Sequence, residues 1–138
     1  MEKYTIENDI PCYRIKASSF PEGVLAAHQQ LHAIFPYSAG RKYYGISRPE
    51  GKGVIAYWAA AEQLPGDAPG ETIDTFIIPK GQYTGTDILQ FRKDIPAIGR
   101  TFQLLLTDPQ IDPDSFCLEW YYNMDDVRCM VRLSSVSV

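Results

Sequence analysis

Apolar and polar positions in the first half of the chain alternate along some segments and recur at helical spacing in another. The alternation after Pro11 predicts a strand over 10–17. The apolar positions 24, 27, 31, 34 and 35 have the spacing of an amphipathic helix, which Pro36 ends. Two further strands, 41–48 and 54–60, are joined by a turn rich in proline and glycine. The predicted order is therefore strand, helix, strand, strand.

The second half repeats this predicted order. We expect a strand over 72–78, extended by 82–85, and a helix from Gly85 or Thr86 to Ile95 that Pro96 stops. Three more strands are expected, over 100–106, 115–122 and 127–133. The chain 1–138 is then a single domain with pseudo-repeats at about 10–62 and 72–133. It predicts an α+β fold, in which two pseudo-symmetric strand-helix-strand-strand units form one antiparallel sheet with two helices and a central cleft.

One carboxylate stands in the most aromatic of these strands, 115–122. Glu119 lies on the face that also carries Cys117 and Tyr121, while the other face is apolar. A charge in mid-strand runs against strand preference. Glu119 is therefore either a solvent-facing charge or a buried anion that needs a basic side chain, a hydroxyl or a bound cation. We expect its strand and the Trp58 strand to occupy equivalent places beside the pseudo-twofold axis.

Composition narrows the classes of function. The net charge is −4, from 13 basic and 17 acidic residues, and there is no long basic run, which argues against direct nucleic-acid binding. No apolar stretch has the length of a membrane span or the pattern of a secretion signal, so we expect a cytoplasmic protein that does not act at a membrane. Nine tyrosines suit a binding surface.

Other groups with chemical potential are weaker candidates. His28 and His32 are four residues apart on the first predicted helix, but no third ligand accompanies them, so we expect residues on the flank of a helix and no metal. Cys12, Cys117 and Cys129 show no zinc spacing, and no histidine stands beside Cys117 in the sequence to activate it. No cofactor is implied.

The order of elements and two short motifs resemble the GyrI-like small-molecule-binding family, the effector-binding domains of bacterial transcription regulators. The first motif is Ile78-Pro79-Lys80-Gly81-Gln82-Tyr83, which in the family precedes the second helix. The second is Glu119-Trp120-Tyr121, whose glutamate in the family faces cationic, lipophilic ligands among aromatic residues, as in multidrug binding. No helix-turn-helix precedes residue 1, so the resemblance implies a stand-alone module.

The resemblance implies that Glu119 points into a pocket. We expect Trp58, Tyr44 and Tyr121 to form the walls of this ligand-binding site, with Tyr83 at the position of the family tyrosine. Core packing remains an alternative for each aromatic residue, and the strand register that decides the side of Tyr44 is open. If Glu119 is buried among aromatic rings, its pKa should be raised.

Three functions follow, in decreasing order of preference. The first is a stand-alone sensor or sequestering protein for a small lipophilic ligand, with Glu119 supplying the counter-charge when that ligand is cationic. The second is a hydrolase of reactive small molecules in which Glu119 is catalytic, as reported for some stand-alone relatives of the family. The third is a protein-interaction module; a protein partner and a homodimer are both left open.

Overall fold

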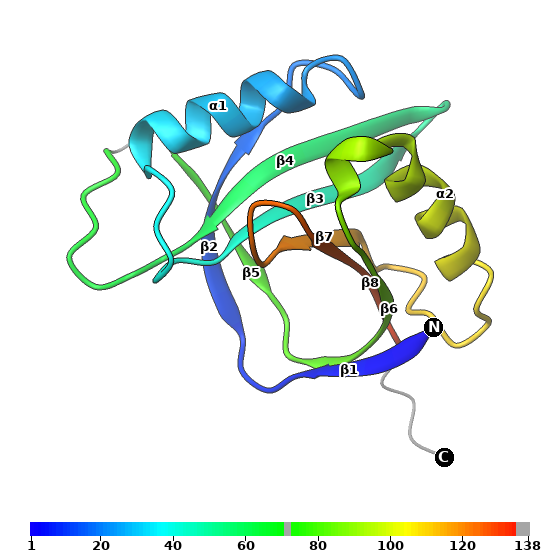
Figure 1. Ribbon diagram of the computed structural model, residues 1–138. Helices are drawn as coiled ribbons and strands as arrows, with labels where there is room; N and C mark the ends of the chain where they lie inside the picture. The colour runs from blue at the N-terminus through cyan, green and yellow to red at the C-terminus, as the bar shows by residue number, and fades with distance from the viewer. Residues whose placement is uncertain (71–72, 135–138) are drawn as a thin grey trace.

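A computed structural model describes residues 1–70 and 73–134 of the chain. Within them, eight strands form one sheet, and two α-helices, α1 (Val24–Ile34) and α2 (Pro96–Leu105), pack on it (Figure 1). One turn of 3-10 helix, η1 (Phe91–Lys93), precedes α2. The strands are β1 (Glu2–Ile6), β2 (Ile10–Lys16), β3 (Tyr43–Gly51), β4 (Val54–Glu62), β5 (Asp74–Ile78), β6 (Gly81–Ile88), β7 (Cys117–Tyr121) and β8 (Val127–Arg132). The predicted α+β class with one antiparallel sheet, two helices and a central cleft is confirmed.

The sheet is built from two crossed halves. Its order is β1-β6-β8-β7-β3-β4-β2-β5, and every neighbouring pair is antiparallel. The elements β2-α1-β3-β4 and β6-α2-β7-β8 have the same order, and each is preceded by a strand that pairs with the other half: β1 with β6, and β5 with β2. The two crossing turns meet where the Lys80 amide donates to Asp9 Oδ1 at 2.8 Å. The exchange of strands curls the sheet into a half-barrel.

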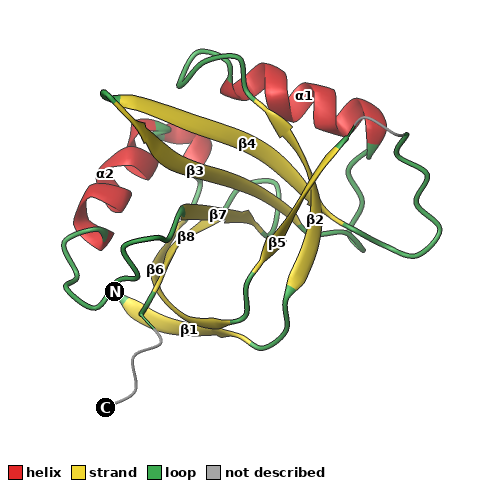
Figure 2. Ribbon diagram, turned by 180° about the vertical axis from the view of Figure 1, so that it is seen from behind, coloured by secondary structure: helices red, strands yellow, loops and turns green. Residues whose placement is uncertain are grey.

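The helices lie on the outside of this curl (Figure 2). The two faces of the sheet have separate cores. Outside, α1 covers a cluster around Leu31 and Tyr57, and α2 covers one around Leu105 and Cys129. Inside, a third cluster spans the strands from Cys12 across to Met130. The strands β7 and β3 meet at the centre of the sheet, so their outward side chains lie between the areas that the two helices cover.

Apart from β1, which the sequence pattern does not predict as a strand, the first half of the chain has the predicted order. The helix predicted from apolar spacing is α1, and it ends one residue before Phe35 and two before Pro36. The turn between β3 and β4 contains Gly51 and Gly53, both with positive φ (88° and 74°), a conformation that glycine adopts without strain. The strand predicted over 72–78 corresponds to β5, which begins at Asp74; position 72 of the prediction lies outside the described residues.

Two predictions in the second half are wrong. The segment expected to begin a helix at Gly85 or Thr86 continues β6 to Ile88, because it is paired with β8 throughout and, at Gly85, also with β1. The strand expected over 100–106 is part of α2, which begins at Pro96. Proline is compatible with the first turn of a helix, where its missing N–H has no partner to lose. The spacing of Ile98, Phe102 and Leu105 is the helical pattern that the run of leucines obscured.

Candidate functional site

Glu119 lies at the centre of the sheet and is buried. It stands on β7 directly opposite Gly45 of β3, with Cys129 of β8 on its other side. Only 5% of its surface is exposed, so it is not a solvent-facing charge. Because alternate residues of a strand point to opposite faces, Cys117, Glu119 and Tyr121 share the outer face, between the areas covered by α1 and α2.

Two tyrosine hydroxyls converge on one oxygen of this carboxyl group. Tyr57 of β4 donates a hydrogen bond to Glu119 Oε1 at 3.0 Å, and the Tyr121 hydroxyl donates a short hydrogen bond to the same atom. His28 of α1 continues the chain, with its Nε2 2.8 Å from the Tyr57 hydroxyl oxygen. When Tyr57 donates to Glu119, its oxygen accepts from His28, which is then the Nε2–H tautomer. Side chains from β4 and β7 therefore bind the carboxyl group directly, and α1 supports it through Tyr57.

Glycine at position 45 makes room for this arrangement. A Cβ at this position would overlap the Tyr57 hydroxyl oxygen, and it would lie 2.6 Å from Glu119 Oε1 and 2.9 Å from Tyr57 Cζ. These separations are shorter than ordinary van der Waals contacts, so any larger residue must displace Tyr57, Glu119 or both. Because Gly45 has no side chain, the Glu119 carboxyl group and the Tyr57 hydroxyl can meet over its backbone.

Aromatic rings surround the two tyrosines. Phe20 stacks on Tyr57 with ring centroids 5.8 Å apart, and His28 meets the same ring edge-on at 5.7 Å. The Tyr121 ring has edge contacts with His28 at 5.5 Å and with Phe91 at 5.3 Å. Phe91 is buried, whereas Phe20 is 39% exposed. Phe20 is therefore the covering ring most open to solvent.

The carboxyl group has no basic partner among the described residues: none of their salt bridges includes Glu119. Burial raises the pKa of Glu119 above its ordinary value, and the hydrogen bonds from Tyr121 and Tyr57 counteract only part of that rise. Burial also lowers the pKa of His28 to about 4, so the imidazole is neutral at physiological pH. The site is thus a desolvated acid held by neutral donors.

Of the predicted site residues, the structure brings Tyr121 to Glu119 and places Trp58, Tyr44 and Tyr83 elsewhere. These three belong to the core on the inside of the curl. The expectation that Trp58 and Tyr44 form the walls around Glu119 is therefore wrong. The reason is strand parity: Tyr44 pairs with Trp120, one position from Glu119, and so points to the opposite face.

The aromatic residues on the inner face have other partners. The Trp58 ring lies 4.3 Å from the Arg14 guanidinium carbon, and the Tyr83 hydroxyl donates to the carbonyl of Pro79 at 2.6 Å. The Trp58 strand, β4, is predicted from the sequence to be the equivalent of β7, and this prediction is also wrong. The equivalent strand is β3, since β7 and β3 are the adjacent central strands. The equivalent of Glu119 across the pseudo-twofold axis is therefore Gly45.

Sequence reasoning missed two residues that complete the site. Tyr57 is adjacent to Trp58 and so lies on the outer face; only the register that pairs it with Ser47 reveals this. His28 was expected on a helix flank, yet it lies on the buried side of α1 beside Ala27 and Leu31. Its helical spacing from Leu31 is the signal that could have indicated this.

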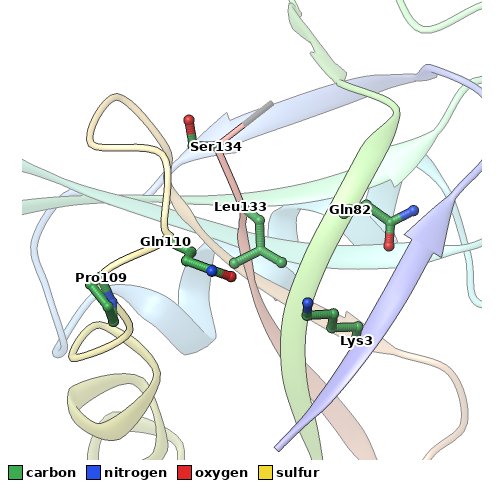
Figure 3. A pocket seen from close by; sticks show the side chains of 6 residues that line it. All are labelled: Lys3, Gln82, Pro109, Gln110, Leu133 and Ser134. Atoms are coloured by element: carbon green, nitrogen blue, oxygen red, sulfur yellow. The ribbon is translucent and has the colours of Figure 1, made fainter. Parts of the chain in front are cut away.

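Other potential sites in the described part of the chain are less developed. Residues 1–70 and 73–134 hold no cluster of three or more groups suited to a metal ion. A hollow of about 570 Å³ near β1 and β6 is lined mostly by exposed side chains and has no carboxylate or histidine (Figure 3). A smaller hollow of about 290 Å³ lies beside η1, lined by Gln90, Arg92, Lys93 and Asp125. No α-helix in the described residues has the length and apolar character to cross a membrane.

Comparison with known proteins identifies the fold and not the family. No protein-family profile matches the chain, and no curated protein matches it. Among solved structures, the fold is similar to that of integron cassette protein VCH_CASS2, a crystal structure from the mobile metagenome of Vibrio cholerae. The two chains share 10% sequence identity with a TM-score of 0.72, over 96% of this chain and 95% of the cassette protein. The chain therefore has the fold of this cassette protein.

Proposed function

We propose that this chain is a small-molecule-binding module that holds a lipophilic cation at Glu119. The observation that carries this proposal is a carboxyl group only 5% exposed, set among aromatic rings, that forms no ion pair with any described residue. A buried carboxylate without a counter-charge is unfavourable by several kcal/mol. A bound cation would supply the missing charge, and the apolar rings would accommodate the rest of the ligand.

The construction of the site supports a role beyond packing. A glutamine, or any apolar residue of similar size, would fill the same volume without the desolvation of a charge. Instead, Gly45, Tyr57 and Tyr121 together place the carboxyl group at the centre of the sheet. Groups whose pKa is shifted by burial in this way are concentrated at functional sites.

The resemblance of Glu119-Trp120-Tyr121 to the GyrI-like family suggests the biological role. On that basis we propose a sensor or sequestering protein, related to the effector-binding domains of bacterial transcription regulators. The fold shared with the cassette protein is compatible with this role. Trp58, Tyr44 and Tyr83 have no part in the proposed contact with the ligand, since they lie on the other face of the sheet.

Calorimetric titration with a panel of lipophilic cations tests the proposal. Wild type should bind at least one class of cation, and Glu119→Gln should weaken that binding by tenfold or more, or about 1.4 kcal/mol. Glu50→Gln is the matched control, because Glu50 is an exposed carboxylate that pairs with Lys16 at 3.3 Å. Equal binding by wild type and Glu119→Gln would show that Glu119 does not contribute to cation binding.

A second candidate, a hydrolase of reactive small molecules, is favoured by the hydrogen-bonded chain from His28 through Tyr57 to Glu119. In this function Glu119 would accept a proton from the attacking water, a role that its raised pKa suits. Hydrolysis of strained-ring electrophiles by wild type, abolished in a folded Glu119→Gln protein, would support it. No turnover across a broad panel of such substrates would contradict it.

A further inference from the structure

We infer that the Glu119 site selects cations that carry N–H groups, such as protonated amines, amidines and guanidines, over quaternary cations of the same charge. This inference rests on the proposed function and specifies its ligand class. It follows from which atoms of the site are already engaged and which are open.

The two carboxyl oxygens of Glu119 differ in their hydrogen bonding. Oε1 accepts from both Tyr57 and Tyr121, which fills its two lone-pair directions. Oε2 receives no hydrogen bond from any residue within 1–70 and 73–134. Oε2 is not one of the buried described atoms that lack a hydrogen-bond partner, so it keeps contact with solvent. A ligand that displaces this solvent leaves a strong acceptor that needs a new donor.

The nearby donors of the protein are not available to fill it. Both tyrosine hydrogens are directed to Oε1, and His28 is hydrogen-bonded to Tyr57. Cys117 shares the outer face and Cys129 is the cross-strand neighbour of Glu119, but a thiol is only a weak donor. Once a ligand has displaced the solvent at Oε2, the donor must therefore come from the ligand, and an N–H on a positive nitrogen is the strongest kind available.

The aromatic rings of the site are poorly placed to bind a quaternary cation in their place. Recognition of a quaternary ammonium group requires open ring faces. Tyr57 directs its hydroxyl edge towards the carboxyl group, and its ring is stacked against Phe20. Tyr121 also directs its hydroxyl to Oε1, and its ring is packed by His28 and Phe91. The site therefore offers a ligand the carboxyl group of Glu119 and no set of open aromatic ring faces.

A matched pair of probes tests this selectivity. 3-Phenylpropylammonium and its N,N,N-trimethyl derivative have the same charge and aryl group, and only the first has N–H donors. We expect wild type to bind the ammonium form at least about tenfold more tightly, since a hydrogen bond to a charged group contributes on that scale. The preference should disappear in Glu119→Gln and persist in Glu50→Gln, in which an exposed carboxylate is removed.

The outcomes separate this inference from the proposed function. If the trimethyl compound binds wild type as tightly as the ammonium form or more tightly, and both lose affinity in Glu119→Gln, the selectivity is refuted and the cation site stands. If neither compound nor any member of the wider cation panel binds wild type, the proposed function itself is refuted. The comparison on wild type does not depend on the folding of any variant.

Discussion

Gly45→Ala should disrupt the Glu119 site directly, because a Cβ at this position meets both Tyr57 and Glu119. The added Cβ would overlap the Tyr57 hydroxyl oxygen and approach Glu119 Oε1 to 2.6 Å. Tyr57 would have to move, so its hydrogen bonds to Glu119 and His28 would break. Breaking hydrogen bonds of buried groups destabilises by about 1–3 kcal/mol each.

The opposing effect is small. Alanine is favoured over glycine in a strand by about 0.5–1 kcal/mol, because the unfolded chain is less free. We therefore expect a net loss of about 2–4 kcal/mol in the free energy of unfolding. For a chain of this length, that corresponds to a fall in Tm of roughly 10 °C.

Thermal and urea unfolding of wild type and four variants provide the assay: Gly45→Ala, Gly99→Ala, Tyr57→Phe and Gly45→Ala with Tyr57→Phe. Gly99→Ala is the control, because a Cβ at position 99 of α2 meets no atom within 4 Å, and this variant should be as stable as wild type or slightly more so. In Gly45→Ala with Tyr57→Phe, the overlapping hydroxyl is absent, so the double variant should lose about 1 kcal/mol less than the sum of the single losses. If Gly45→Ala is as stable as Gly99→Ala, the packing described around Glu119 is incorrect.

Three further predictions concern access, acid stability and charge. Phe20→Ala should raise the association rate of a bound cation several-fold in stopped-flow experiments, because the exposed ring over Tyr57 is removed; an unchanged rate would place the entry elsewhere. Asp67 receives two hydrogen bonds from Arg41, which lowers its pKa from 3.8 to about 2, so this pair stabilises the fold above pH 4 and the effect is lost as pH falls towards 2. Arg41→Ala should therefore lower Tm more at pH 6 than near pH 2, where only the hydrogen bond to the Glu62 carbonyl and the contact with Phe35 remain to be lost; an equal difference at both values would contradict the pairing. The pKa of Glu119 is raised above 4.5 in the folded state, so its carboxyl group loses its proton more readily in the unfolded chain. Wild type should therefore lose stability as pH rises from 4.5 to the folded-state pKa of Glu119, and Glu119→Gln should not. Parallel curves of Tm against pH for the two proteins would argue against a desolvated carboxyl group.

The parts of the fold that the sequence predicts are those with a single local pattern. The helix α1 has both amphipathic spacing and a terminating proline, and it is found as predicted. The alternation in β7 places Glu119 and Tyr121 on one face, and the structure has them there. In α2, by contrast, Leu104 to Leu106 have the appearance of a buried strand, and a proline can begin a helix as well as end one.

The composition of the site depends on information that is not local. Whether Tyr57 or Trp58 faces Glu119 is decided by the pairing of β4 with β3 and of β3 with β7, and a shift of one residue exchanges them. The contact between His28 and Tyr57 requires the packing of a helix across a sheet, 29 positions apart in sequence. Aromatic residues near a carboxylate in sequence are therefore a weak guide to those near it in space.

The carboxyl ¹³C resonance of Glu119, assigned by comparison with Glu119→Gln, gives the most direct test of the central claim. Its titration can be followed in protein labelled at glutamate, with and without a saturating lipophilic ammonium ion. We predict a pKa above the ordinary value in the free protein, and a marked fall when the cation binds, because the ligand stabilises the charged form. A titration that is unchanged by saturating, verified binding of the cation would show that Glu119 is not the anchor.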